Sequence, residues 1–278
     1  MGSFWPIPDP IAFSFGRFEV RWYGIIIAIA LVIGIVVSYF IAKYRNQKAD
    51  EVINFAPFAV IFGVIGARLL HVIVNWSYYG GNLSYIFAFR RGGLAIQGVM
   101  LGGILALLVF CKIRKLDFWI WADIISPALI LGQALGRWGN YFNQEAFGVP
   151  ASPPWGLYID PAYRPSAYSN AEYFLPTFFY EFLANLLLFA LLLWLHRLYK
   201  HRPDRFPYGL IFTIYLGVYA LYRSIIEFYR LDSSYFLGVK VVYIIDGITI
   251  IAALIITNYL FKRFRLKKMQ EELEKSEE

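Results

Sequence analysis

Long runs of uncharged or nearly uncharged residues alternate with short polar segments along most of the chain. The runs cover residues 22–42, 52–76, 92–111, 118–135, 178–195, 206–222 and 241–261. Most are long enough to cross a hydrocarbon layer of ~30 Å as helices, which takes roughly 20 residues each. The chain is also 59% hydrophobic and 19% aromatic, with a mean hydropathy of +0.54, which is more apolar than a soluble domain needs. We therefore predict an all-α polytopic membrane protein with about seven transmembrane helices and a small extracytoplasmic loop domain.

The basic residues between these runs predict an orientation in the membrane. Most of the 26 lysines and arginines fall on one side of the predicted bilayer. These residues are Lys43, Arg45, Lys48, Lys112, Arg114, Lys115, Arg197, Lys200, Arg202, Arg205, Lys262, Arg263, Arg265, Lys267, Lys268 and Lys275. The positive-inside rule puts that side in the cytoplasm, so the N-terminus is expected outside and the C-terminus inside. The net charge of +7 then reflects topology and attraction to anionic lipid rather than binding of nucleic acid.

The same pattern divides the chain into a membrane domain at 1–265 and a charged cytoplasmic tail at 266–278. Residues 136–176 form the longest predicted non-helical stretch, so an extracytoplasmic loop region is expected at 136–177. Residues 11–21 alternate between apolar and polar around Gly16, which predicts a short hairpin or an interfacial segment on the outer face. Gly98 and Gly102 form a pair of small residues four positions apart, which predicts a close contact between helices.

The segment 136–148 (GRWGNYFNQEAFG) places polar side chains and glycines directly after an apolar run. Arg137, Asn140, Asn143 and Glu145 supply a guanidinium, two amides and a carboxylate. Guanidinium and amide donors on a backbone with flexible glycines suit an anionic oxygen, above all a phosphate. A lipid headgroup is the natural candidate at the edge of a membrane span. The alternative is a loop fixed by its own internal hydrogen bonds.

A second polar group lies on the sixth span. Tyr219, Arg223, Glu227 and Arg230 are spaced by four, four and three residues, which keeps them on one stripe of a helix. An arginine and a glutamate at i and i+4 can be purely structural. Charges at membrane depth are costly, however, and usually line a site.

Two weaker groups lie earlier in the chain. Arg68 and His71 are inside the second span, where a snorkelling arginine with an interfacial histidine is an equal alternative. Arg90 and Arg91 precede Gln97, which could be a simple hydrogen-bonding contact between helices. All four groups fall near the predicted outer face with few carboxylates, and this balance favours an anionic lipid over a cation pathway.

The sequence gives little support for the binding of a cofactor or a metal. The three histidines, His71, His196 and His201, and the single cysteine, Cys111, form no cluster with metal-ligand spacing. We expect neither a metal nor a cofactor. Cys111 is a poor candidate nucleophile because the polar groups lie on the opposite side.

At these motifs the chain resembles the prolipoprotein diacylglyceryl transferase family over nearly its whole length. Residues 136–148 fit the family signature G-R-x-G-N-[FY]-x-N-x-E-x-x-G at every fixed position. Further matches are Arg21-Trp22-Tyr23-Gly24, Gly66-Ala67-Arg68, Gly92-Gly93, Pro176-Thr177 with Tyr180-Glu181, and the set Tyr219, Arg223, Glu227 and Arg230. Three positions depart from the pattern: Gln97 where members often carry histidine and sometimes tyrosine, His71 where an aromatic residue is more usual, and Asp246.

The resemblance implies a reaction and two partners, phosphatidylglycerol and a prolipoprotein signal peptide with its lipobox cysteine. The diacylglyceryl group passes to the cysteine thiol, a thioether forms and glycerol phosphate is released. The location implied is the bacterial cytoplasmic (inner) membrane, with the active site facing the extracytoplasmic leaflet.

The chemistry then allows roles to be assigned to the candidate residues. Arg137 and Arg223 are expected to hold the phosphate, while Asn140, Asn143 and Gln97 bind headgroup oxygens. Glu227 would orient Arg223, or Glu145 could serve as the base, since a glutamine at 97 cannot accept a proton at neutral pH. Tyr23 and Tyr219 would line the lipid entrance. The remaining substrate-binding candidates are Gly148, Arg68 and Arg230.

Other functions remain open at this point. A lipid-binding or lipid-translocating membrane protein could use the same arginines, and Gln97 admits a catalytically impaired relative of the transferase. A phosphatidyl-type transferase is a weaker alternative, because it normally needs a metal-binding carboxylate cluster.

Overall fold

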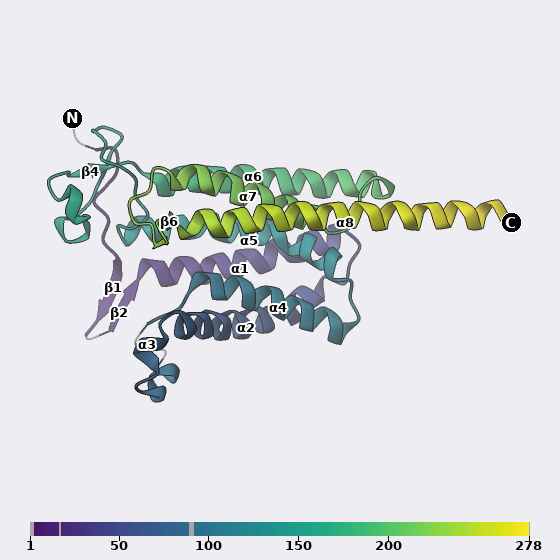
Figure 1. Cartoon of the computed structure of the whole chain (residues 1–278), viewed down its shortest axis with the longest axis horizontal. Helices are drawn as coiled ribbons and strands as arrows, with labels where there is room; N and C mark the ends of the chain where they lie inside the picture. Colours follow the sequence, from purple (N-terminus) through teal and green to yellow (C-terminus); the bar gives the residue numbers. More distant parts are fainter. Residues whose placement is uncertain (1–2, 17, 89–91, 278) are drawn as a thin grey trace. The chain divides into compact units, whose positions relative to one another are not determined.

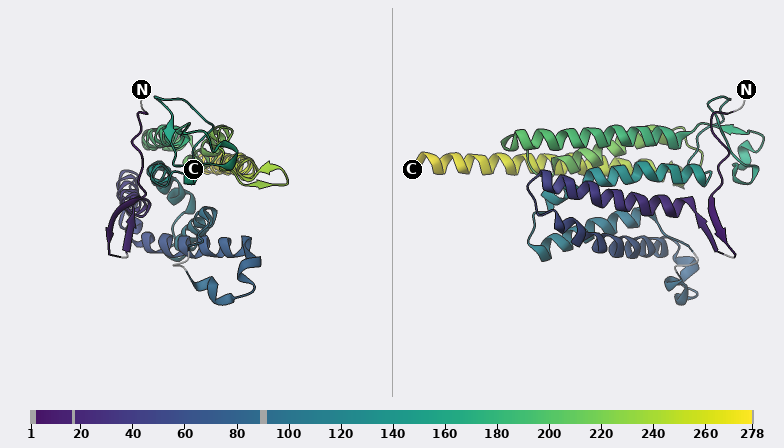
Figure 2. Two further views of the ribbon diagram at one scale, coloured as in Figure 1. Left: turned by 90° about the vertical axis from the view of Figure 1, so that its left-hand side faces the viewer. Right: turned by 180° about the vertical axis from the view of Figure 1, so that it is seen from behind.

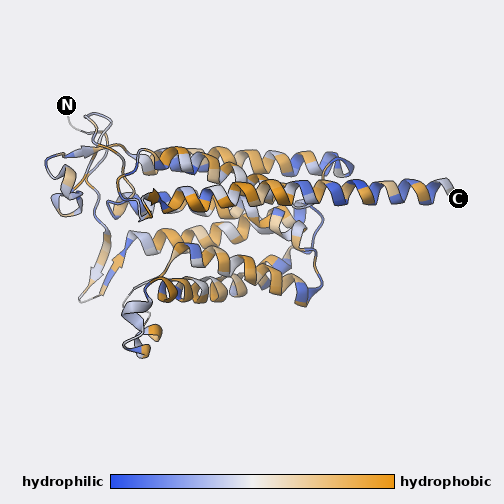
Figure 3. Ribbon diagram, viewed as in Figure 1, coloured by the Kyte–Doolittle hydropathy of each residue, from blue (hydrophilic) through white to orange (hydrophobic). Residues whose placement is uncertain are grey.

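The structure, a computed structural model, describes residues 3–16, 18–88 and 92–277 (Figure 1). In this part of the chain, 7 helices are long and apolar enough to cross a membrane. They are α1 (Trp22–Tyr44), α2 (Asp50–Val74), α4 (Ile96–Arg114), α5 (Phe118–Phe142), α6 (Thr177–His201), α7 (Leu210–Glu227) and α8 (Val241–Glu277). Apolar residues cover most of their length (Figure 3). The predicted polytopic all-α membrane fold is confirmed.

The remaining elements are short and lie in the connections. The helical ones are α3 (Trp76–Tyr79), η1 (Leu83–Phe87), η3 (Pro161–Tyr163), η4 (Ser166–Tyr168) and η5 (Pro203–Arg205). The strands form three antiparallel pairs, which are β1 (Ile11–Phe15) with β2 (Phe18–Arg21), β3 (Leu157–Tyr158) with β4 (Tyr173–Phe174), and β5 (Tyr235–Phe236) with β6 (Val239–Lys240). The first pair is the hairpin predicted at 11–21, with Gly16 at a φ of +58°. A positive φ of this kind favours glycine because it has no Cβ.

The chain divides into two compact units, of which the smaller is Ser38–Ile124. Its centre is the pair α2 and α4, which pack along each other. The contact is close because glycines face backbone: a Cβ on Gly98 would collide with the carbonyl oxygen of Gly66, and one on Gly102 with that of Phe62. The close helix contact predicted from Gly98 and Gly102 is therefore confirmed.

The close packing of α2 on α4 leads us to a prediction about stability. Gly98→Ala should destabilise the smaller unit by about 1–3 kcal/mol, the usual range for an added methyl group in a tightly packed site. Gly103→Ala, on the same helix, is the control, because nothing lies within 4 Å of its Cβ position, and alanine favours a helix over glycine. Thermal unfolding in detergent should separate the two variants. Equal melting temperatures would contradict the close packing.

The larger unit, Met1–Val37 with Ile125–Glu278, holds most of the predicted site. In it α7 packs against both α6 and α8 (Figures 1 and 2). The segment expected as a charged tail at 266–278 continues α8 as a helix to Glu277. It is exposed and carries an ion pair between Lys267 and Glu271 at 3.6 Å. This part of α8 extends past the end of α6 (Figure 2).

One expected boundary is wrong. The non-helical stretch expected from residue 136 begins only after Phe142, because α5 continues through the first part of the 136–148 motif. Trp138 and Tyr141 give that last part an aromatic face, which packs against Phe178 of α6. On another face, Gly139 leaves room for Tyr23, whose Cδ2 would lie 2.5 Å from a Cβ there. Burial of these faces keeps the polar end of the helix folded.

The loop from residue 143 to residue 176 packs on this end of α5 and α6. Its buried core includes Phe147, Leu157, Ile159 and Phe174, all at most 3% exposed. The N-terminal segment is tied to the same region, since the Tyr141 hydroxyl donates to the carbonyl of Pro6 at 2.6 Å. The loop is thus an ordered platform next to the polar ends of the helices.

Candidate active site

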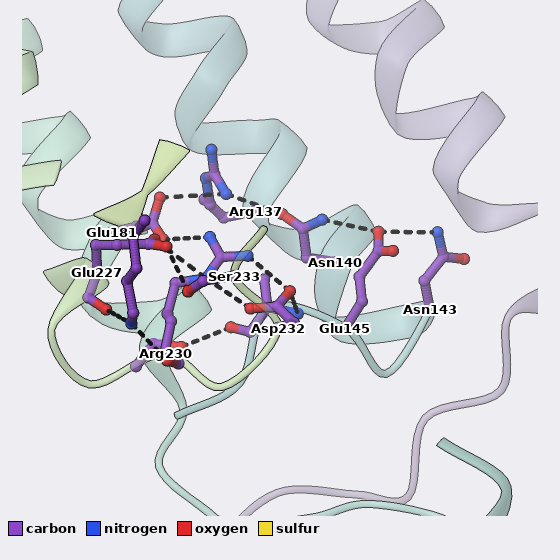
Figure 4. A network of polar contacts seen from close by, with 12 residues as sticks. Arg137, Asn140, Asn143, Glu145, Glu181, Glu227, Arg230, Asp232 and Ser233 are labelled. Atoms are coloured by element: carbon purple, nitrogen blue, oxygen red, sulfur yellow. Dashed lines mark hydrogen bonds and ion pairs between the residues drawn. The ribbon is translucent and has the colours of Figure 1, made fainter. Parts of the chain in front are cut away.

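A buried glutamate on α6 gathers three arginines from other segments of the larger unit (Figure 4). Oε2 of Glu181 lies 3.1 Å from Nη1 of Arg137 on α5 and 3.7 Å from Nε of Arg223 on α7. Its Oε1 accepts a hydrogen bond from Nη1 of Arg230 at 3.2 Å. The Glu181 residue is 0% exposed. A carboxylate this deeply buried needs charged partners, and the arginines supply them.

A second buried carboxylate, Glu227 at the end of α7, completes the cluster. Its Oε2 accepts from Nη1 of Arg223 at 2.5 Å, and its Oε1 accepts from the Ser233 hydroxyl at 2.5 Å. The ammonium of Lys240 donates to the backbone carbonyls of Glu227 and Arg230, at 2.7 and 2.9 Å. The end of α7 and the loop that follows it are therefore held in one arrangement.

Arg230 also makes a two-pronged pair with Asp232 just beyond α7. Its Nε and Nη2 donate to the two carboxylate oxygens at 2.9 and 2.8 Å. Burial alone would raise the pKa of the Asp232 carboxyl, but hydrogen bonding to Arg230 and its positive charge outweigh burial, so the pKa is lowered. Burial likewise opposes the charge on Arg230, yet its bonds and attraction to Asp232 raise the pKa of the guanidinium. Both groups are charged at neutral pH.

The polar residues of the 136–148 motif form a chain of hydrogen bonds from the arginine cluster outward. Nη1 of Arg137 donates to Oδ1 of Asn140 at 3.2 Å, one turn along α5. The amide groups of Asn140 and Asn143 both donate to Oε1 of Glu145, at 2.8 and 3.2 Å. The alternative function of these residues, which is to fix the motif by its own internal hydrogen bonds, therefore holds in part. The same bonds also fix the directions of the amides and the carboxylate.

Gly148 joins the motif to the segment after α7. It forms an antiparallel bridge with Arg230, and a Cβ at this position would lie 2.8 Å from Cγ2 of Thr177. Only glycine fits so close a backbone approach. The main chain that carries Arg230 is thereby fixed against the motif that carries Arg137.

Two buried polar atoms at the centre have hydrogen-bonding capacity to spare. Within the described residues, Nε of Arg137 and Oε2 of Glu181 have no hydrogen-bond partner. The 3.1 Å contact of Oε2 with Arg137 is an ion pair that lacks hydrogen-bond geometry. Buried donors are nearly always satisfied in folded proteins, so an unsatisfied guanidinium nitrogen points to a ligand with an acceptor oxygen.

Within the described residues of the larger unit, the charge balance differs from the one expected. The sequence pattern predicts cations with few carboxylates, but the folded cluster and its motif contain as many carboxylates as cations. The cations are Arg137, Arg223, Arg230 and Lys240, and the carboxylates are Glu145, Glu181, Glu227 and Asp232. The correction has a physical reason, since arginines buried near a membrane need counter-ions. Each guanidinium has five N–H donors, so a paired arginine can still bind a phosphate.

The two tyrosines expected to line the lipid entrance also belong to the larger unit. Tyr23 is the second residue of α1 and packs on Gly139. Tyr219 lies on α7, one turn before Arg223, with its ring against that of Tyr222. Asp246, a departure from the family pattern, is buried on α8 and accepts from the Ser224 hydroxyl at 2.9 Å.

Arg68 and Gln97 belong to the smaller unit. The Arg68 guanidinium donates to backbone carbonyls of the loop between α2 and α4, among them Gly92 at 2.6 Å and Tyr85 at 2.6 Å. It thereby organises that loop, and its substrate-binding role stays a prediction. Gln97 lies exposed in the first turn of α4. Arg90 and Arg91 lie outside the described residues.

Sequence reasoning missed the residue at the centre. Glu181 stands in the motif that resembles the family, but no site role was expected for it. One signal was available: a lone carboxylate one turn inside an apolar span is costly unless it is paired. Asp232, Ser233 and Lys240 were also missed, because they lie in a short connection without a recognisable pattern.

The fold and this site define a polytopic membrane protein with a buried arginine–carboxylate cluster at the polar ends of its helices. Comparison with known proteins identifies the family within this class. The family described as prolipoprotein diacylglyceryl transferase matches residues 10–259, and the chain belongs to this family.

Several curated relatives carry the name phosphatidylglycerol–prolipoprotein diacylglyceryl transferase. The one from Acaryochloris marina is 45% identical over 226 residues, which is 81% of either chain. The one from Trichormus variabilis is 40% identical over 258 residues, 92% of either chain. The one from Synechocystis is 42% identical over 226 residues, covering 81% of this chain and 80% of the relative.

Proposed function

We propose that this protein transfers the diacylglyceryl group of phosphatidylglycerol to the thiol of a lipobox cysteine in prolipoproteins. The thiol sulfur bonds to the glycerol carbon that carries the phosphate. The bond from that carbon to oxygen breaks, and glycerol phosphate leaves with the electron pair while a base takes the thiol proton. The observation that supports this most is the gathering of Arg137 and Arg223 around one oxygen of Glu181, at 3.1 and 3.7 Å.

The arginines act on the leaving group. A phosphodiester carries one negative charge, and the departing monoester gains a second as the bond breaks. Guanidinium groups that are already in place stabilise this growing charge without reorganising. Arg137 offers its unsatisfied Nε, and Glu227, 2.5 Å from Arg223, orients the second guanidinium.

The thiol needs help to lose its proton, because a free thiol has a pKa of ~8.5. Glu145 fits the base role: its carboxylate is exposed, next to the cluster, and aligned by the amides of Asn140 and Asn143. These amides and Gln97 bind headgroup oxygens in this proposal. Gly148, Arg68 and Arg230 contribute to substrate binding, and Tyr23 with Tyr219 lines the path of the lipid.

The positive-inside pattern and the bacterial relatives support a place in the cytoplasmic (inner) membrane with the site facing the extracytoplasmic leaflet. In this proposal the lipobox cysteine reaches the site from that face, where both substrates meet.

A reconstituted assay tests the function. The purified protein in phosphatidylglycerol vesicles is given a synthetic prolipoprotein peptide, and mass spectrometry follows the peptide and the released glycerol phosphate. We expect the mass of one diacylglyceryl group on the cysteine and one glycerol phosphate per modified peptide. Movement of lipid between leaflets without loss of the headgroup would favour a lipid-translocating protein instead, and absence of both would favour an impaired relative.

Gln97 provides a separate prediction. Because its amide cannot accept a proton, its contribution is hydrogen bonding, which a tyrosine hydroxyl also provides. Gln97→Tyr should therefore retain thioether formation within about tenfold of the unchanged protein, the range of one hydrogen bond. A folded Gln97→Tyr protein with no activity would contradict this assignment.

A further inference from the structure

A pocket of about 510 Å³ lies beside the arginine cluster, on the loop side of the larger unit. Its lining includes the polar or charged residues Arg21, Asn143, Glu145, Arg164 and Asp232, and the small residue Ala162. We propose that this pocket binds the prolipoprotein residues that directly follow the lipobox cysteine. This inference rests on the proposed function and adds a subsite to it.

The pocket shares walls with the catalytic cluster. Glu145 and Asn143 belong to the hydrogen-bonded chain that starts at Arg137, and Asp232 is paired with Arg230. A cysteine whose thiol meets the glycerol carbon near Arg137 would have its next residues only a few ångströms away, since an extended chain advances about 3.3–3.6 Å per residue. In the proposed orientation, the peptide residues after the cysteine lie outside the bilayer. The loop from residue 143 to residue 176 is on the same side.

One wall of the pocket has a fixed backbone conformation. The turn Asn143–Phe147 that forms one wall contains Gln144 and Ala146 at φ values of +52° and +58°, which non-glycine residues rarely adopt. The buried Gln144 side chain holds this turn in place: its amide donates to the carbonyl of Pro8 at 3.2 Å, and its oxygen accepts from the backbone N–H of Asp160 at 2.7 Å. Strained backbone that is fixed by buried hydrogen bonds is typical of binding sites.

The charges of the pocket suit a peptide better than an anionic headgroup. Arg21 and Arg164 are accompanied by Glu145 and Asp232, so donors and acceptors are both present. Arg164 already donates to the carbonyls of Ile159 and Ser169, and Asp232 is paired with Arg230, so Arg21 and Glu145 carry most of the pocket's contribution. A peptide main chain offers N–H and C=O groups that match both kinds, whereas a phosphate offers only acceptors. In the described part of the chain the exposed Arg21 guanidinium has neither a hydrogen bond nor an ion pair, so it is free to donate to a carbonyl.

The test compares two peptides. One ends at the lipobox cysteine as an amide, and the other continues for five residues. With the unchanged protein in phosphatidylglycerol vesicles, we expect kcat/KM for the longer peptide to be higher by about tenfold, the effect of one or two added hydrogen bonds. Ala162→Trp fills the pocket and should remove this advantage while the rate with the short peptide is kept. Arg21→Ala, which opens the pocket instead, should reduce the same advantage.

Ala167→Trp is the matched control, because Ala167 is also exposed on the loop but is not part of the pocket wall. It should leave the preference for the longer peptide intact. Equal kcat/KM for the two peptides with the unchanged protein would overturn the proposal. So would an Ala162→Trp protein that raises KM for phosphatidylglycerol equally with both peptides, which would give the pocket to the lipid headgroup. If the unchanged protein modifies neither peptide, the proposed function itself fails.

Discussion

Replacing Arg137 by alanine is expected to lower the rate of diacylglyceryl transfer by about 10²–10³-fold, the usual cost of removing one preorganised charged contact to a developing oxyanion. The guanidinium lies 3.1 Å from Glu181 and keeps an unsatisfied Nε in the cluster. Its loss would remove charge where the leaving phosphate gains it. The measurement is thioether formation by mass spectrometry with the purified variant in phosphatidylglycerol vesicles.

Arg197→Ala is the matched control for this variant. Arg197 is exposed at the opposite end of α6 from Glu181, about 24 Å along a helix that rises 1.5 Å per residue. It should keep full activity. Near-normal transfer by a folded Arg137→Ala protein would refute the role of Arg137 and, with it, the reading of the cluster as a phosphate site.

The apolar spans could be predicted from the sequence because hydrophobicity over some 20 residues is a local property. The end of α5 could not be predicted from the local pattern, because residues 136 to 142 pack against residues that are far away in the sequence. Trp138 packs on Phe178 and Gly139 accommodates Tyr23. Gly98 and Gly102 were predicted correctly because spacing along one helix already reveals a contact face.

The site was recognisable in part for the same reason. Arg223 and Glu227 share one stripe of α7, and the 136–148 motif is continuous in the chain. The expectation that Arg230 continues this stripe was wrong, because α7 ends at Glu227 and Arg230 lies just beyond it. The expectation of few carboxylates was wrong for two reasons. Glu181 comes from α6, and only folding brings it within 3.2 Å of Arg230. Asp232, 2.8 Å from Arg230, follows it by two residues in a short connection that has no recognisable pattern. Most contacts in such a polar network join residues that are far apart in the sequence. The sequence can therefore identify the residues of the network but not which residue pairs with which.

The central position of Glu181 leads to the second large effect. Glu181→Gln keeps the shape of the side chain but removes the negative charge that faces Arg137, Arg223 and Arg230. Because breaking a buried ion pair by removing one partner typically costs about 3–5 kcal/mol, the variant should unfold at a clearly lower temperature in detergent. It should also lose transfer activity, since the repelling guanidinium groups would no longer be held together.

The control is Glu172→Gln, which makes the same chemical change on an exposed loop residue of the same unit and should alter neither property. Addition of phosphatidylglycerol provides a further distinction. If the cluster binds phosphate, the lipid headgroup supplies a new counter-ion and should recover part of the thermal stability lost in Glu181→Gln, with a smaller gain for Glu172→Gln. A Glu181→Gln protein as stable as the unchanged one would mean that Glu227 and Asp232 alone neutralise the arginines, and Glu181 would then lose its place as the organising centre of the site.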